Sequence, residues 1–539
     1  MTSFQAAGWV RLGLVLLTAS LASSPVRAAS ESQIFPLAQT LSTPSDEVFL
    51  AQITPDATLG TEASVVTPNA SVNGNPATLI EGGATRGANL FHSFQEFNVN
   101  SFESVYFNNP ANIQNILSRV TGNNISNIDG VLGVNGSANL FLLNPNGILF
   151  GSGASLDISG SFFASTADSL VFENNAEFSA TNPASAPLLT VSVPVGVQLG
   201  NSPGTIRGTE ASLEIRQRET LALLGGTIDL DGVQISAPGG RVLLGGVGGT
   251  GTVALQFSNS GSRVSLTGWE LPENLDRSPI SLTNSASITV IDRIGGEISI
   301  DASDITVSSS SLDAGIGEGL GVPDADSGNI ELNATGELTL SDSSSIANRV
   351  RENSAGNAGD IRVVANVVNV LGSAYLDSNT SGQGNAGNVS LTGDTVNVSE
   401  GAFLLSETEG QGNAGNVSLT GDTVNVSEGA YLSSGTEGQG NAGNVTLTGE
   451  TVNVSEGAYL SSESSGQGNA GNVTLTGETV NVSEGAFLSS STTGEGNAGN
   501  VTLTGDTVEV SVGAFLLSET EGQGNAGNVT LTGETVNVS

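Results

Sequence analysis

Side chains that carry acid–base, nucleophilic or metal chemistry are scarce in this sequence. Its 539 residues contain one His and no Cys, and every basic residue is an Arg. A Ser-His-Asp site would have to use His92, and a pair of His metal ligands cannot be assembled. A Walker A phosphate loop is excluded too, because it requires a Lys. His92 lies between Phe91 and Ser93, and we interpret it as a structural residue.

Two short motifs have the spacing of ligand-binding loops without the expected surroundings. Residues 246–251 read Gly-x-Gly-x-x-Gly after a predicted strand at 241–244. Residues 252–257 then read as another strand, where a dinucleotide site needs a helix N-terminus. Asp229-Leu-Asp231-Gly lacks the remaining ligands of an EF-hand loop. We therefore predict no catalytic residue, no metal site and no cofactor.

Acidic residues dominate the charge, with 53 Asp and Glu against 14 basic residues and a net charge of −39. This field repels nucleic acid and anionic membrane surfaces, so we expect neither as partner and no membrane insertion. Two acidic columns recur in the C-terminal part: Asp394, Asp422, Glu450, Glu478, Asp506 and Glu534; and Glu400, Glu428, Glu456 and Glu484. Like charges about 4.8 Å apart in water repel by about 0.9 kcal/mol. We expect Ca²⁺ or moderate salt to stabilise the protein by screening them.

The elements that position these side chains follow a repeat of 28 residues. Asn-Ala-Gly begins at Asn357, Asn385, Asn413, Asn441, Asn469, Asn497 and Asn525. Each unit contains three alternating aliphatic pairs, as in Val389-x-Leu391, Val396-x-Val398 and Ala402-x-Leu404. Three short strands with inward aliphatics fit one coil of a β-solenoid, whereas a propeller blade needs about 40 residues. Stacked coils would pair at about 4.8 Å.

One column of the repeat is aromatic: Phe403, Tyr431, Tyr459, Phe487 and Phe515. The flanking positions are Ala and Leu, and period two allows one of the two sets to face the core. The position two residues after the aromatic is mostly Ser, as in Ser433 and Ser461, which favours an outward aromatic face. An exposed apolar stripe is typical of an interaction site, so these rings are a candidate ligand stripe. Self-stacking that only stabilises the coil is the alternative.

Hydrophobic periodicity is close to two in the rest of the chain as well, for example in 281–291 and 296–301. The best helical candidate is a short cap-like piece at Asn112–Val120. Two segments, 269–279 and 315–328, read as loops that leave the coils. The sequence therefore predicts an all-β fold.

A tight turn lies between two strongly apolar segments at Asn144-Pro145-Asn146-Gly147. Asn at the first position, Pro at the second and Gly at the fourth are typical of a type I turn. Leu140–Leu143 and Ile148–Phe150 are predicted as the strands on either side.

The N-terminus has the features of a secretory signal. Arg11 precedes the apolar run 12–17, and Val26-Arg27-Ala28 offers a cleavage site. A later cleavage near Ala51 is an alternative. The run is shorter than the roughly 20 residues of a membrane span, which favours a cleaved peptide.

Five ordered motifs give the region around the turn a resemblance to a known family. They are Arg86–Val99, Leu117–Gly122, Ser126–Gly130, Leu142–Gly151 and Gly160–Thr166, with looser matches at Leu221–Gly226 and Ala237–Val242. Together they resemble the N-terminal secretion domain of filamentous haemagglutinins, exported by two-partner secretion. The resemblance covers 57–250, and Asn109-Pro110-Ala111-Asn112 matches the family's other Asn-Pro turn only in part.

The resemblance implies a right-handed parallel β-helix with an N-terminal cap. It also implies export from a Gram-negative cell, by a signal peptide and then through a cognate outer-membrane barrel transporter with POTRA modules. Asn144, Pro145, Asn146, Gly147 and Ile148 would form the transporter-recognition turn. The expected function is an extracellular or surface-associated adhesin that contacts a host cell, a glycan or a neighbouring cell.

Other functions remain open at this point. They are a matrix or sheath filament without a specific ligand, a β-helix enzyme that degrades polysaccharides, and ice binding through a ladder of outward Thr residues. The expected organisation is a signal peptide at 1–28, an irregular segment at 29–56, the secretion domain at 57–250, an irregular solenoid at 251–355 and repeats at 356–539. Because Ser539 falls in the middle of a coil, we expect the chain to be part of a longer protein.

Overall fold

The computed structural model describes residues 52–183, 192–260, 263–511 and 513–539. The chain divides into two units, Met1–Val48 and Phe49–Ser539, and everything below concerns the second. The predicted signal peptide and its cleavage sites lie outside the described residues. Within the described ranges there is no α-helix, only two single 3-10 turns, Gly60–Glu62 and Glu173–Asn175.

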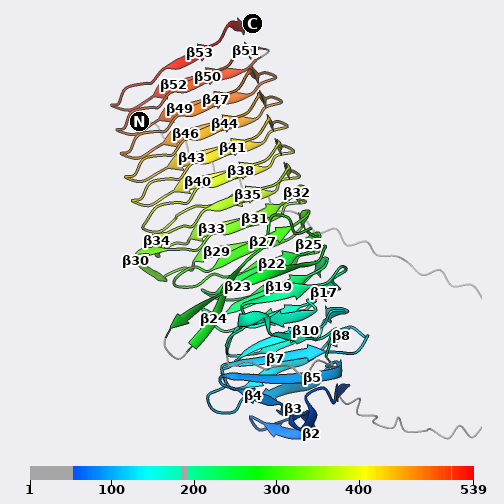
Figure 1. The fold of residues 1–539 in the computed structure, drawn as a ribbon. Coiled ribbons are helices and arrows are strands. Elements are labelled where there is room, and N and C mark those ends of the chain that lie inside the picture. Colours follow the sequence, from blue (N-terminus) through cyan, green and yellow to red (C-terminus); the bar gives the residue numbers. More distant parts are fainter. Residues whose placement is uncertain (1–51, 184–191, 261–262, 512) are drawn as a thin grey trace, which may run out of the picture. The chain divides into compact units, whose positions relative to one another are not determined.

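Three long sheets, each containing one strand from almost every coil, form the body of this unit (Figure 1). Sheet 1 consists of β1 (Ile53–Pro55), β4 (Ala84–Arg86), β5 (Asn89–Phe97), β7 (Asn115–Val120), β10 (Asn139–Leu143), β13 (Phe162–Ser165), β19 (Thr220–Gly225), β22 (Arg241–Gly246), β27 (Glu297–Ala302), β31 (Ile330–Ala334), β35 (Ile361–Val364), β38 (Val389–Thr392), β41 (Val417–Thr420), β44 (Val445–Thr448), β47 (Val473–Thr476), β50 (Val501–Thr504) and β53 (Val529–Thr532).

Sheet 2 consists of β8 (Ser126–Ile128), β11 (Gly147–Phe150), β17 (Thr205–Thr209), β20 (Ile228–Asp231), β25 (Ile280–Thr283), β28 (Ile305–Ser308), β32 (Glu337–Ser341), β36 (Val367–Val370), β39 (Thr395–Val398), β42 (Thr423–Val426), β45 (Thr451–Val454), β48 (Thr479–Val482), β51 (Thr507–Val510) and β54 (Thr535–Val538).

Sheet 3 consists of β2 (Ser64–Val72), β3 (Asn75–Gly82), β6 (Ser104–Asn108), β9 (Val131–Asn135), β12 (Ser155–Asp157), β18 (Ser212–Glu214), β21 (Gln234–Ser236), β26 (Ser287–Thr289), β29 (Ser311–Ile316), β33 (Ser345–Val350), β37 (Tyr375–Asp377), β40 (Phe403–Thr408), β43 (Tyr431–Thr436), β46 (Tyr459–Ser464), β49 (Phe487–Thr492) and β52 (Phe515–Thr520).

Consecutive coils pair in parallel and in register. In the repeats Val417 pairs with Val445, Val424 with Val452 and Tyr431 with Tyr459, all 28 residues apart. The predicted fold class, an all-β parallel β-helix, is confirmed. One local prediction was wrong: Asn112–Val120 is not helical, because β7 within it is a fully buried strand that pairs with β5 and β10.

At the N-terminal end, antiparallel strands cover the edge that parallel coils would leave open. β2 and β3 form a hairpin whose second strand pairs with β6, and β1 and β4 pair antiparallel with β5. An uncovered edge strand invites pairing with other chains. The hairpin and the two short strands therefore form an N-terminal cap.

Two additions lie outside the regular coils. An antiparallel sheet is built from β14 (Ser169–Val171), β15 (Glu177–Ser179), β16 (Gly196–Leu199), β23 (Gly251–Ser260) and β24 (Arg263–Glu270). A small parallel pair joins β30 (Gly321–Asp326) to β34 (Ala355–Asn357). The segment 315–328, expected as a loop, therefore contains a paired strand. β23 begins at the last Gly of the Gly-x-Gly-x-x-Gly motif, so a strand lies where a dinucleotide site would need a helix.

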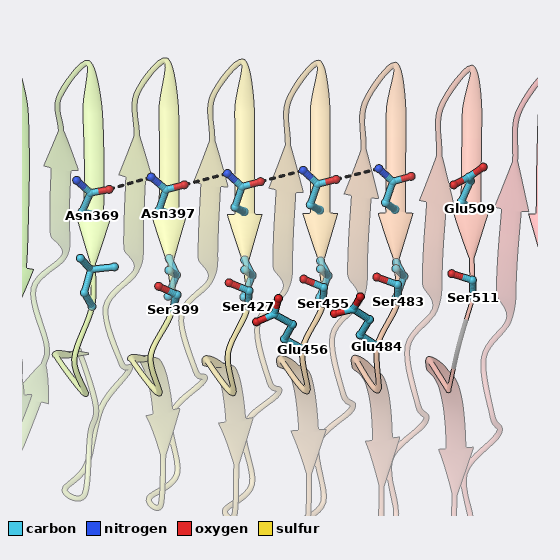
Figure 2. A pocket seen from close by; sticks show the side chains of 18 residues that line it. Asn369, Asn397, Ser399, Ser427, Ser455, Glu456, Ser483, Glu484, Glu509 and Ser511 are labelled. Carbon is cyan, nitrogen blue, oxygen red and sulfur yellow. Dashed lines mark hydrogen bonds between the residues drawn. The ribbon is translucent and has the colours of Figure 1, made fainter.

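Polar side chains also stack in register along the outside of the coils. On sheet 2, Asn397 donates to Asn369, and the same amide hydrogen bond recurs to Asn481 at 2.8–2.9 Å (Figure 2). The Nδ2 of each Asn donates to the Oδ1 of the Asn one coil earlier, so an amide inside the ladder donates one hydrogen bond and accepts another. The ladder therefore helps to fix the register between coils.

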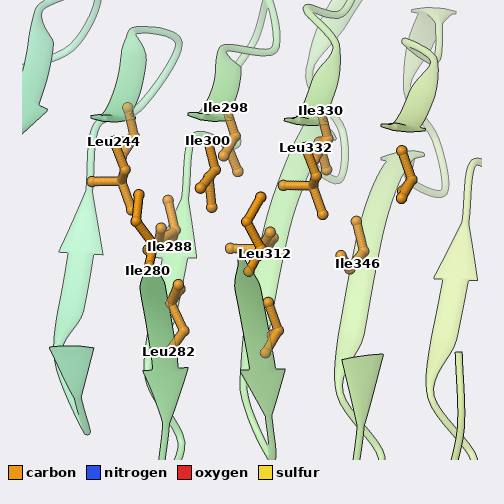
Figure 3. Packing of buried hydrophobic residues seen from close by; sticks show 14 of the residues in the cluster. Leu244, Ile280, Leu282, Ile288, Ile298, Ile300, Leu312, Ile330, Leu332 and Ile346 are labelled. Carbon is orange, nitrogen blue, oxygen red and sulfur yellow. The ribbon is translucent and has the colours of Figure 1, made fainter. Parts of the chain in front are cut away.

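The core consists of aliphatic columns from the three sheets. Ile280 of β25, Ile298 of β27 and Ile330 of β31 point into the same interior (Figure 3), and each is at most 1% exposed. Burying such a side chain stabilises the fold by about 1.5–3 kcal/mol. Because no coil encloses its own core, this stabilisation depends on stacking.

Candidate functional site

The turn predicted from Asn144 to Gly147 joins β10 of sheet 1 to β11 of sheet 2. The Gly147 backbone N–H donates to the Asn144 carbonyl at 3.1 Å. Gly147 has φ +133°, and a Cβ there would lie 2.9 Å from the Thr205 carbonyl oxygen. A branched residue at this position would therefore strain the backbone and push against the next coil.

The Asn144 side chain fastens this turn to the preceding coil. It is fully buried, and its Nδ2 donates to the Asn124 carbonyl and to Ser126 Oγ, both at 3.0 Å. Its Oδ1 accepts from the Asn146 backbone N–H and from Asn146 Nδ2, also at 3.0 Å. Asn146 Nδ2 additionally donates to the Gly122 carbonyl at 2.8 Å. Each amide thus holds the turn and the coil below it in one arrangement.

Burial divides the five predicted turn residues into two groups. Asn144, Gly147 and Ile148 are buried, whereas Pro145 is half-buried and Asn146 is exposed. A partner can touch only the second group directly. The buried residues can affect binding of a partner only indirectly, because they determine the conformation of the turn.

The partly matched Asn-Pro segment plays a similar role one coil earlier. Asn109 Oδ1 accepts from the backbone N–H groups of Ser137 and Ala138 at 2.9 and 3.1 Å, while its Nδ2 donates to the Ile113 carbonyl at 3.1 Å. Asn112 has φ +72°, a conformation that Asn tolerates better than most residues. The shared Asn-Pro pair was the sequence signal for this second fastening.

A buried amide ladder was not predicted at all. Asn139 Nδ2 donates to Asn115 at 2.9 Å, and Asn115 Nδ2 donates to Asn89 at 3.0 Å. Asn139 Oδ1 also accepts from the Ser161 backbone N–H at 2.9 Å. The three Asn residues begin β5, β7 and β10, and this position was the signal that could have revealed them.

Arg119 is the largest polar side chain in the interior, with 1% exposure. Its Nε donates to Ser93 Oγ and one Nη to Thr58 Oγ1, both at 2.9 Å, and the other Nη contacts the Ser179 carbonyl. The guanidinium also lies 4.2 Å from the centre of the Phe178 ring. Burial lowers its pKa to about 10, so it stays charged at neutral pH.

Asp56 balances this buried cation. Burial favours the neutral acid, but hydrogen bonds from Thr121, Thr58 and Ser93 outweigh it and lower the pKa of Asp56 below its usual value. The carboxylate and the guanidinium together tie three parts of the domain to each other: the segment before the cap, the coil of β5 and β7, and the outer antiparallel sheet.

Within the ranges that the structure covers, the ring of His92 contacts a hydroxyl and no acidic side chain. Its Nδ1 lies 2.9 Å from Ser64 Oγ, and its buried Nε2 has no hydrogen-bond partner in the described part of the chain. Burial lowers its pKa to about 3. Among the described residues no carboxylate hydrogen-bonds to the ring, and no group of three His, Asp or Glu could hold a metal ion. The expected effect of Ca²⁺ on the acidic columns stays a prediction.

The aromatic column forms a continuous ladder on sheet 3. Tyr431, Tyr459 and Phe487 stack with ring centres 5.0 Å apart and planes within 3° of parallel. Phe403 and Phe515 are tilted by 46° and 40° against their neighbours and are more exposed. The central rings cover one another's faces and turn their edges outward.

The core side of the same strands is Ala and Leu, since Ala430 and Leu432 are fully buried. The Ser column does not behave as expected: Ser433 and Ser461 share the aromatic side of the strand but are 3% and 0% exposed. Ser433 donates to Glu407 at 2.7 Å. The alternation of residue types along the strand predicted the outward direction of these Ser side chains, but it did not predict that neighbouring residues bury them.

No helix among the described residues is long and apolar enough to cross a membrane. Comparison with protein families gives a match to the TPS secretion domain over residues 51–293, a longer range than the 57–250 expected from the motifs. No curated protein sequence matches the chain.

Comparison with solved structures gives matches to two secretion domains. The HMW1 secretion domain from Haemophilus influenzae is 17% identical, with a TM-score of 0.44, over 86% of this chain and 98% of that one. The filamentous hemagglutinin secretion domain is 14% identical, with a TM-score of 0.23, over 90% of this chain and 99% of that one. Residues 51–293 of this chain therefore match the TPS secretion domain.

Proposed function

We propose that this protein is a surface-contact exoprotein, exported through a cognate outer-membrane barrel transporter with POTRA modules. The observation that carries the proposal is the match to the TPS secretion domain at 51–293, followed by less regular coils and then by the stacked 28-residue repeats. The secretion domain is the part that the transporter recognises for export. The repeats form an extended extracellular surface that acts as an adhesin.

Coil-by-coil folding explains how such a chain leaves the cell. Beyond β7 each coil pairs with the one before it, up to β53 and β54. A chain emerging unfolded adds each new strand to the edge left by the last coil. Every added coil buries aliphatic side chains, and this gain opposes movement of the chain back through the transporter.

The turn Asn144–Ile148 is the proposed recognition element. Its buried amides fix its shape, and Pro145 and Asn146 form its accessible surface. We assign direct transporter contact to these two residues, and support of the turn to Asn144 and Gly147.

Secretion assays test this assignment. Asn146→Ala combined with Gly147→Val should block export while synthesis continues, because it removes the two hydrogen bonds of the Asn146 side-chain amide and places a β-branched residue at φ +133°. Pro145→Ser changes a half-buried residue of the turn, keeps the side-chain hydrogen bonds of Asn144 and Asn146, and should reduce export without unfolding the domain. The measurement is the amount of protein in the medium relative to the total.

A matched control is Asn425→Ala, which removes one amide from an exterior ladder of the repeats and should leave export unchanged. Normal export of the double variant would contradict the proposal. Two further assays on the secreted protein separate the alternatives. A sheath filament would be exported but bind no cell or glycan in a binding assay, and an enzyme would shorten polysaccharides incubated with it.

A further inference from the structure

A long polar groove runs across successive coils on the outside of sheet 2 (Figure 2). It has a volume of about 720 Å³. One wall is the amide ladder from Asn369 to Asn481, and the other contains Ser427, Ser455 and Ser483 together with Glu456 and Glu484. This surface is separate from the recognition turn and from the aromatic column.

The amides of this ladder keep unused hydrogen-bonding capacity. An Asn amide has two N–H donors and two acceptor lone pairs, and the ladder uses one of each per coil. The Asn and Ser side chains are half-buried rather than fully exposed. Each coil therefore presents one N–H and one carbonyl lone pair at intervals of about 4.8 Å, and from Asn397 to Asn481 a Ser hydroxyl lies in the neighbouring column.

The charges of the groove restrict its ligand further. The ladder and the Ser column are neutral, and the charged groups that line the groove are carboxylates: Glu456, Glu484 and Glu509. With the net charge of −39, these groups repel a polyanion. A hydroxyl group, in contrast, both donates and accepts, and so complements an amide that offers one group of each kind.

The groove edge also holds an unusual backbone conformation. Glu400, Glu428, Glu456 and Glu484 all have φ between +51° and +54°, where Gly or Asn is normally found. Of these four residues, Glu456 and Glu484 line the groove (Figure 2). Carboxylates at a groove edge are strong acceptors for sugar hydroxyls.

We propose that this groove binds a neutral, linear polysaccharide lying along the coil axis, one sugar per coil. The repeat of an extended sugar chain is close to the coil spacing of about 4.8 Å, so the same contacts recur at every step. From Asn369 to Asn481 the ladder spans four intervals, about 19 Å. The inference rests on the proposed extracellular function and assigns it a ligand class.

The binding test uses the secreted full chain and oligosaccharides of defined charge. Cellohexaose and mannohexaose are the neutral probes, and hexamers of galacturonate and of chitosan are the anionic and cationic ones. We expect at least one neutral hexamer to bind in calorimetry. Its affinity should rise with chain length up to about five sugars and then level off. Binding of no neutral hexamer, or of a charged hexamer alone, would overturn the inference.

A pair of variants places the ligand in the groove. Ser427→Leu with Ser455→Leu fills the groove with a residue that already occupies the same column at Leu371, and should weaken binding at least about tenfold. The matched control, Ser433→Leu with Ser461→Leu, makes the same change under the surface of sheet 3. Leu405 and Leu517 already occupy that column, and this variant should bind as the parent does.

Equal binding by the two double variants would contradict the groove assignment. The amount of each variant in the medium is measured in parallel. Normal export without oligosaccharide binding overturns this inference alone, whereas failure of the parent chain to be exported overturns the proposed function.

Discussion

Amides and one guanidinium, rather than acids and bases, carry the most specific contacts of the secretion domain. Asn144 makes four hydrogen bonds through one buried side chain. The guanidinium of Arg119 hydrogen-bonds to three segments that are distant from it in sequence. A buried polar group that loses its partner costs about 1–3 kcal/mol, so these side chains select one arrangement of the coils.

His92 predicts how the secretion domain responds to acid. Its pKa is lowered to about 3 in the folded protein and is about 6.5 in an unfolded chain. Between these values the unfolded state binds the extra proton, so stability falls as the pH drops from about 6.5 toward about 3. The slope is at most about 1.4 kcal/mol per pH unit. Hydrogen exchange of the β5 amides between about pH 7 and pH 5 measures it.

His92→Gln is the control, since Gln is polar and does not titrate. Asp56 also loses stabilising charge in acid, but its lowered pKa confines that loss to lower pH, below the range of the measurement. An equal pH slope in the variant and the parent would show that His92 does not cause the effect.

At the scale of single strands, the ring ladder has two possible roles, contact with a ligand and support of sheet 3. Parallel rings about 5.0 Å apart stabilise each other by roughly 0.5–1.5 kcal/mol per pair. Their covered faces are closed to a stacked sugar, whereas their edges and the more exposed Phe403 remain open.

Replacing Tyr431, Tyr459 and Phe487 by Ser tests the ligand stripe. If the stripe contacts cells, adhesion should be lost while export changes little, because the strands keep their buried Ala and Leu residues. Adhesion equal to that of the parent would refute the stripe. A lower melting temperature with intact adhesion would assign the rings to stacking alone.

The sequence was most informative where columns repeat. Val417, Val424 and Leu432 could be assigned to the core because their spacing returns in every unit, and the structure places all three there. It was least informative where a contact depends on a neighbouring coil. The strand β7 was mistaken for a helical piece because its six residues are buried on both faces, which removes the alternation that marks a strand.

The whole solenoid behaves as a one-dimensional stack, and this predicts tolerance to the loss of a full coil. Deletion of residues 441–468 joins Gly440 to Asn469, so the same columns meet again. Because each coil contacts mainly its neighbours, the shortened protein should be exported and resist protease like the parent. Limited proteolysis of the secreted protein is the measurement.

Deletion of half a coil, residues 441–454, is the control for this experiment. It brings turn residues into the aliphatic columns and should leave a protease-sensitive C-terminal part. Equal resistance of the two deletions would mean that register between coils matters less than the paired columns indicate.

The parallel register has a mechanical consequence. Backbone hydrogen bonds between coils run along the stacking axis. A force that pulls on the last coil therefore breaks the hydrogen bonds of one coil before those of the next. Each coil released adds 28 residues, which extend to about 90–100 Å, in place of about 4.8 Å in the stack. If one end of such a chain were held at a surface, its length would increase under flow as coils unfold and decrease again as they re-form.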